Sequence, residues 1–173
     1  NYAAQLEVLG LWHWALYVVL HMPDPQPAGT SHLKEQAIRA LLARNVASAT
    51  AEQQRFVLER IRVPLTWWHE AKSWVARNEH DVEAELEHCR LSEQWQRVHE
   101  LLLPFIAPHA FLQSREAELV RVTELLQQLA QHQEAIKHWR LGGGIYHDYI
   151  TTRTQYIEFM DQYTTSSPPP ADL

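Results

Sequence analysis

The sequence has a single cysteine, Cys89, among its 173 residues. One cysteine can form no disulfide within the chain, and it lacks the companions that a cysteine-rich zinc site requires. We therefore predict a reducing compartment, either cytosol or nucleus.

Positive charge is also scarce. Lysine and arginine total 15 against 21 aspartates and glutamates, which gives a formal net charge of −6. No basic run of the kind that binds phosphates is present, so we expect no direct contact with nucleic acid.

Long apolar runs are missing as well. The longest, Leu11–Leu20, is interrupted by His13 and is too short for the roughly 20 residues that a membrane-spanning helix needs. We expect no signal peptide ahead of it. We expect no membrane insertion.

Alternation of apolar and polar residues at period two is absent, and this argues against a sheet. Helical spacing is present instead, most clearly near the C-terminal end, where apolar side chains and one threonine recur every three or four residues: Ile145, Tyr149, Thr152, Tyr156, Phe159 and Tyr163.

Prolines and glycines divide the helical pattern. Gly10, residues 23–30 and Gly142–Gly144 each interrupt it, Pro64 fits the first turn of a helix, and Pro104 and Pro108 are expected to end one. The sequence predicts about eight or nine helices in one all-α module over residues 1–163, followed by a flexible Pro/Ser-rich tail over 164–173.

Two segments resemble each other. In both, a helix bearing Leu and Glu leads into a helix with a tryptophan nine positions before a proline, Trp14 before Pro23 and Trp95 before Pro104. Such weak self-similarity is typical of stacked helical hairpins. We predict an irregular α-solenoid.

No arrangement of catalytic residues stands out. His69-Glu70 begins like a zinc-protease motif, but no second histidine follows four positions after His69. Cys89 has no glycine-rich turn beside it, and the adjacent His147 and Asp148 diverge by about 100° on a helix. We expect no enzyme, no metal site and no cofactor.

Aromatic residues are plentiful, with seven tryptophans and six tyrosines. Placed on a helix, Trp67, Trp68 and Trp74 share one arc, which indicates packing. The residues expected in the core are Trp12, Trp14, Trp67, Trp68, Trp74, Trp95, Tyr149 and Phe159. Those expected at a partner interface, because they lie toward polar sides or loops, are Tyr17, Trp139 and Tyr146.

Three separated strings carry a family resemblance: YAAQLEVLGLWHWALYVVLH (2–21), RVPLTWWHEAKSW (62–74) and GGGIYHDYI (142–150). In order and spacing they resemble the C-terminal, tail part of the α-helical scaffold nucleoporins of the Y-shaped nuclear pore subcomplex. These belong to the ancestral coatomer elements and are released from a self-cleaving precursor with phenylalanine-glycine repeats.

The resemblance implies a structural role at the nuclear envelope, within the nuclear pore complex. The expected partners are other Y-complex scaffold nucleoporins, chiefly the two short-arm α-helical nucleoporins that meet at the hub. The family's β-propeller partner is expected to bind outside this fragment, since nothing here matches the strand that completes it.

Two other readings remain open on sequence alone. A tetratricopeptide-like adaptor that takes up short peptides is compatible with paired hairpins, although the strict repeat spacing is missing. A helical hydrolase is disfavoured, because no catalytic group of residues is apparent.

Overall fold

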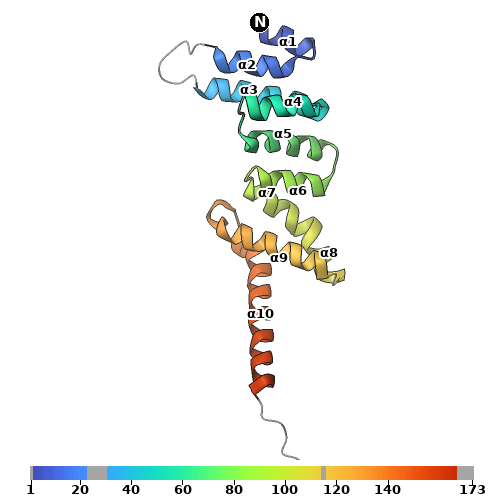
Figure 1. Cartoon of the computed structure of the whole chain (residues 1–173). Helices are drawn as coiled ribbons and strands as arrows, with labels where there is room; N and C mark the ends of the chain where they lie inside the picture. The colour runs from blue at the N-terminus through green and yellow to red at the C-terminus, as the bar shows by residue number, and fades with distance from the viewer. Residues whose placement is uncertain (1, 23–30, 114–115, 167–173) are drawn as a thin grey trace, which may run out of the picture. The chain divides into compact units, whose positions relative to one another are not determined.

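The computed structural model describes residues 2–22, 31–113 and 116–166, and these residues are helical without strands (Figure 1). The all-α prediction is confirmed. The proline-rich connection over 23–30 lies outside the described residues, as does most of the expected tail, while the last helix runs through Ser166.

The described residues fall into two compact units, Asn1–Gln94 and Trp95–Leu173. Within them, several helical segments continue directly into one another, so that the described residues form nine continuous helices separated by turns. This agrees with the predicted eight or nine.

Unit 1 is a stack in which α1 packs on α2, α2 on α3, α3 on α5 and α5 on α6. Its elements are α1 (Tyr2–Val8), α2 (Trp12–His21), α3 (Ser31–Asn45), the 3₁₀ turn η1 (Val46–Ser48), α4 (Ala51–Arg55), the π-helical η2 (Phe56–Arg60), α5 (Leu65–Asn78) and α6 (Val82–Leu91).

Local sequence signals set the helix ends in unit 1. Thr50 and Gln53 form a reciprocal capping box at the start of α4, and the side chain of Asp81 accepts a hydrogen bond from the Ala84 N–H at the start of α6. Pro64 directly precedes α5. The first N–H groups of a helix have no carbonyl partner within it, so the N–H that proline lacks costs no hydrogen bond there.

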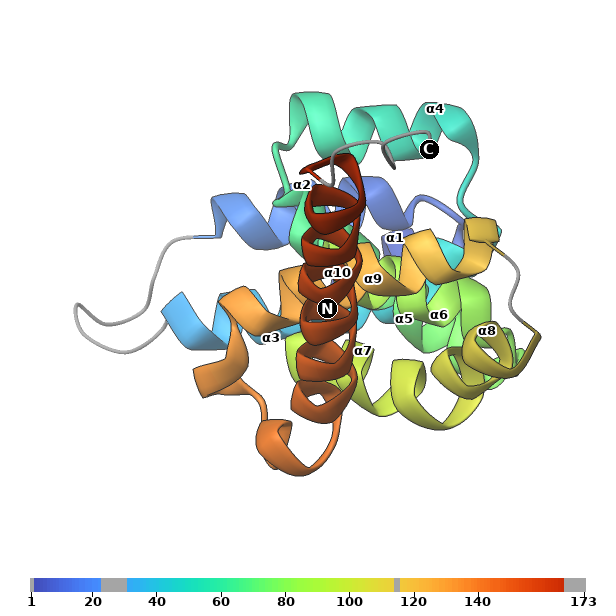
Figure 2. The same ribbon diagram turned by 90° about the horizontal axis from the view of Figure 1, so that it is seen from below.

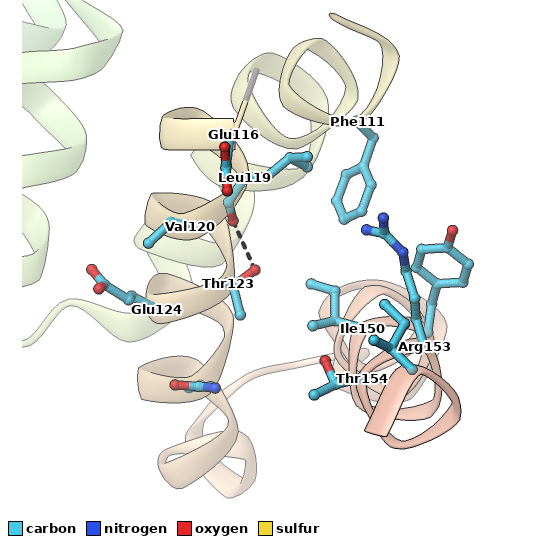
Figure 3. Close-up of a pocket in the computed structure, with 12 residues that line it drawn as sticks. Phe111, Glu116, Leu119, Val120, Thr123, Glu124, Ile150, Arg153 and Thr154 are labelled. Carbon is cyan, nitrogen blue, oxygen red and sulfur yellow. Dashed lines mark hydrogen bonds between the residues drawn. The ribbon is translucent and has the colours of Figure 1, made fainter. Parts of the chain in front are cut away.

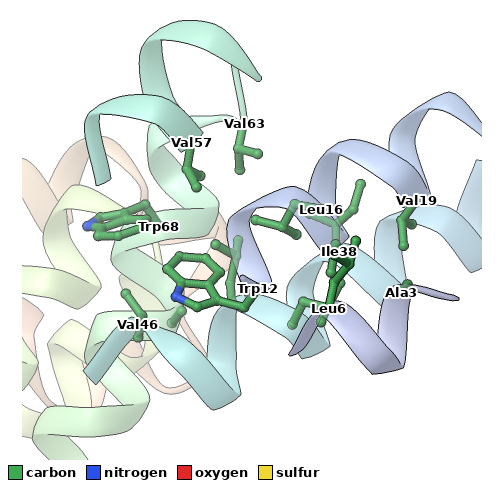
Figure 4. Packing of buried hydrophobic residues seen from close by; sticks show 14 residues of the cluster. Ala3, Leu6, Trp12, Leu16, Val19, Ile38, Val46, Val57, Val63 and Trp68 are labelled. Atoms are coloured by element: carbon green, nitrogen blue, oxygen red, sulfur yellow. The ribbon is translucent and has the colours of Figure 1, made fainter. Parts of the chain in front are cut away.

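The core of unit 1 joins its stacked helices through apolar side chains that include Leu16, Ile38 and Trp68 (Figure 4). Arg–Glu ion pairs connect the same helices: Arg44 with Glu7 between α3 and α1, Arg39 with Glu70 between α3 and α5, and Arg77 with the buried Glu85 between α5 and α6.

Unit 2 comprises α7 (Trp95–Leu101), the π-helical η3 (Leu102–Ile106), α8 (Ala107–Gln113), α9 (Glu116–Gln131), the 3₁₀ turns η4 (Gln133–Ala135) and η5 (Trp139–Leu141), and α10 (Gly143–Ser166). In both views α10 crosses α9 rather than following it (Figure 2). Most of α10 therefore has no helix of this unit along its length.

The expectation that Pro104 and Pro108 end a helix is wrong, because the chain stays helical from Trp95 through Gln113. Pro104 lies inside the π-helical η3, and Pro108 lies in the first turn of α8. A π-helical turn shifts the hydrogen-bond register, which relieves the mismatch that proline causes in a regular α-helix.

Candidate partner-docking surface

The tryptophans expected in the core do not share one environment. Trp12 and Trp68 are buried in unit 1, where the indole N–H of Trp12 donates to Gln53 Oε1 at 3.3 Å. Trp67 is half-buried, and so is Trp95, whose ring stacks on His132 with centroids 4.3 Å apart.

Four of the residues predicted to pack in the core are exposed instead: Trp14, Trp74, Tyr149 and Phe159. Trp14 lies at the surface of α2 beside Phe56, and Trp74 lies at the end of the tryptophan arc, where Arg77 covers its ring. Tyr149 and Phe159 lie on α10, where the Tyr149 ring is 6.0 Å from that of Phe111 on α8 yet stays more than half exposed. Helical spacing identified the face correctly, but it cannot indicate whether another element covers it.

The three residues expected at a partner interface also differ from one another. Tyr17 is exposed and stacks on His21 with centroids 4.0 Å apart, and Tyr146 is half-buried against Phe111. Trp139 is only 8% exposed, so its placement at an interface is wrong. The reason is the glycine run after it, which lets α10 close over its ring.

The start of α10 is fixed by a buried cluster of His99, Trp139 and Gly142–Gly144. The Gly143 N–H donates to His99 Nε2 at 3.0 Å, and the His99 and Trp139 rings are 5.9 Å apart. A Cβ on Gly143 would collide with Trp139, and one on Gly142 would lie 2.9 Å from His99 Nε2. The glycines are therefore needed for close packing rather than for a flexible turn.

Burial lowers the pKa of His99, and the nearby carboxylate of Glu100 opposes this only in part. The neutral ring is the form that can accept the Gly143 N–H at Nε2, since a protonated nitrogen has no free lone pair. The cluster thus depends on an uncharged imidazole.

Beyond this cluster, α10 carries a row of exposed apolar side chains that we call the α10 seam: Ile145, Tyr149, Tyr156 and Phe159. Their exposed fractions are about half or more, with Phe159 at 62%. Successive members are separated by four, seven and three residues, so the row spans two heptads, as in a helix that packs along another helix. Isolated apolar side chains are common on surfaces, but a contiguous row of this kind is typical of interaction sites.

A groove of about 700 Å³ lies beside the seam, between α9 and α10. Phe111, Leu119 and Ile150 surround it, and Arg153 extends into it from α10 (Figure 3). Glu116 and Glu124 contribute carboxylates on the α9 side. The seam and the groove together form a candidate docking surface with an apolar centre and charged edges.

The described residues show no grouping suited to metal binding. No three histidine, cysteine or acidic side chains among them could hold one ion, and Cys89 is buried. His69 Nδ1 on α5 lies 3.1 Å from His88 Nδ1 on α6, so the two imidazoles form a contact between neighbouring helices of the stack. His147 and Asp148 approach to 3.6 Å, closer than their directions on an ideal helix suggest, but the carboxylate is largely exposed.

Among the helices of the described ranges, none has the length and apolar character needed to cross a bilayer.

Sequence reasoning missed His99 as the acceptor for the glycine run. The nearest signal was the run itself, since three consecutive glycines permit close approach of the backbone to another group. Nothing in the local sequence identified a residue 44 positions earlier as that group.

Comparisons with known proteins show which proteins this chain is similar to. Residues 1–75 match the model of the family described as Nuclear protein 96 (Nup96). The nuclear pore complex protein Nup98-Nup96 of Dictyostelium discoideum is 31% identical over 169 residues, which cover 96% of this chain and 8% of that protein.

Two further relatives agree. Nucleoporin nup189 of Schizosaccharomyces pombe is 30% identical across 86% of this chain and 8% of its own length, and NUP96 of Arabidopsis thaliana is 28% identical across 97% of this chain and 16% of its own. The chain thus spans a small part of the relatives it matches.

Proposed function

This chain is a relative of the Nup96 nucleoporins, and on that premise we propose that it is a structural, non-enzymatic part of the nuclear pore complex. The proposal places it at the nuclear envelope, where it supports pore assembly and transport between nucleus and cytoplasm. The observation that carries it is the α10 seam, a row of exposed apolar side chains in a chain whose described residues show no group suited to holding a metal ion.

We further propose that the chain acts in the Y-shaped subcomplex, as the resemblance of its three sequence strings implies. There it would join the short arms to the stem at the hub by packing helix against helix. The α10 seam supports this, because its spacing over two heptads suits a partner helix better than an extended peptide or a small ligand.

The experiment is size-exclusion chromatography of this chain mixed with the two purified short-arm nucleoporins. A stable co-eluting complex is expected for the unaltered chain. The double substitution Tyr156→Ala and Phe159→Ala should weaken it by at least tenfold in Kd, because aromatic residues at interface centres carry much of the binding energy.

Glu158→Ala is the matched control, since Glu158 is exposed and lies on the side of the same helix that faces away from the seam. It should leave binding unchanged. A folded chain that fails to bind either nucleoporin would refute the hub role, and binding lost only to competing short linear peptides would favour a tetratricopeptide-like adaptor.

A further inference from the structure

The segment Arg62–Trp74 is only partly explained by the fold. Trp68 enters the core, but Trp67 is half-buried and Trp74 is 48% exposed. Both of these tryptophans line a pocket of about 220 Å³ between α3 and α5, whose other apolar lining is the alanines Ala40, Ala43 and Ala71. A pocket with aromatic walls and small side chains beside them leaves room for an incoming group.

The size of the pocket limits what can occupy it. Small-molecule and cofactor sites are usually about 300–1,000 Å³, so this space is too small for most of them. It is suited to a single large side chain. Interfaces commonly anchor one aromatic or aliphatic side chain in such a pocket on the opposing surface.

Both tryptophan rings are held in place before any ligand arrives. The Arg39 guanidinium lies 4.7 Å from the centre of the Trp67 ring and is bonded to Glu35 and Glu70. The Arg77 guanidinium lies 4.4 Å from the Trp74 ring and is bonded to Glu85, which is 4% exposed. Rigid walls lower the entropic cost of binding.

The same charges decide the chemistry of the occupant. A cationic ligand, such as a trimethylated lysine in an aromatic cage, would compete with guanidinium groups already on both rings and would meet Arg39 in the lining. An anionic ligand would meet Glu70, while Arg39 is already paired with carboxylates. An uncharged apolar side chain avoids both penalties.

We propose that this α3–α5 pocket binds one leucine-sized or phenylalanine-sized apolar side chain of a partner protein. The site lies in unit 1 and does not depend on the α10 seam. The two proposals can therefore fail separately.

The test uses N-acetyl-leucinamide and N-acetyl-phenylalaninamide as probes of the whole chain. Binding is followed by NMR through the indole N–H resonances of Trp67 and Trp74, assigned with single Trp→Phe variants. Both resonances should shift saturably, with Kd in about the millimolar range expected for so few contact atoms.

Ala43→Leu should abolish the shifts by filling the pocket. Ala43 is exposed on a helix, so the variant should fold with an unchanged melting temperature, and Ala40→Leu is the second choice. Ala4→Leu, at an exposed position of α1, is the matched control and should bind as the unaltered chain does. Absence of a saturable shift, shifts retained by folded Ala43→Leu, or tighter binding of N-acetyl-trimethyllysine amide would each overturn the proposal.

Discussion

At the scale of single residues, tryptophans close in sequence have different roles because their neighbours differ. Trp68 is 2% exposed in the core of unit 1, whereas Trp74 is about half exposed six residues later. A helical arc therefore contains both a core residue and a surface residue, and their effects on stability should differ accordingly.

We expect Trp68→Ala to lower the free energy of unfolding by about 3–5 kcal/mol, the usual range for a large buried aromatic side chain. Trp74→Ala should lower the free energy of unfolding by about 1 kcal/mol, since it removes a side chain that is only half buried and one cation–π contact. Urea denaturation of the two variants measures both values, and equal losses would contradict the different burial of the two side chains.

The buried imidazole of His99 should make stability depend on pH. Its pKa is lowered by burial, so below the unfolded value of about 6.5 the unfolded chain takes up a proton that the folded chain does not. The free energy of unfolding is therefore highest above that pH and falls as the pH drops toward the folded pKa.

His99→Gln should make this fall shallower between pH 7 and pH 5, because the glutamine Oε1 can still accept the Gly143 N–H but does not titrate. His13, His69 and His88 also have pKa values lowered by burial, so part of the slope should remain. Urea denaturation across this pH range is the measurement, and an unchanged slope in a folded variant would show that His99 is not a source of it.

At the scale of helices, three end in the same way although their sequences differ. After α1, α5 and α6 a residue takes a positive φ, namely Gly10, His80 and Glu93. In each case the next N–H bonds to a carbonyl five residues earlier, as in Leu11 to Leu6 at 2.8 Å. This is a Schellman ending, which favours glycine because other residues strain their Cβ in that conformation.

Glu93→Gly should therefore raise the free energy of unfolding by about 1 kcal/mol. Glu93→Ala is the control: it removes the same side chain but keeps a Cβ, so it should give no comparable gain. Thermal unfolding of the pair checks this, and an equal effect of both substitutions would place the cause in the glutamate side chain rather than in the backbone.

Helix identity was predictable from sequence to a large extent, because apolar spacing and capping residues act locally. Pro64 and Gly10 mark observed boundaries. Pro104 does not mark a helix boundary, because the π-helical η3 accommodates it. A change in backbone hydrogen-bond register depends on the surrounding packing, and the local sequence carries no clear sign of it.

At the scale of the whole molecule, the sequence predicted an all-α stack but not its division at Gln94 and Trp95. The predicted repeat pairs Trp14 with Trp95, yet the first is exposed beside Phe56 and the second stacks on His132. Similar sequence therefore did not give equivalent surroundings. Which aromatic side chains are covered depends on contacts between distant segments, as Trp139 and His99 show.

The exposed α10 seam has a consequence for how the protein survives in a cell. In the proposed assembly, a copy without its partner would present exposed aromatic side chains of the kind that chaperones and proteases act on. Binding of the proposed partner would remove that signal by burying the seam. The supply of partner, rather than the rate of synthesis alone, would then set the abundance of this chain.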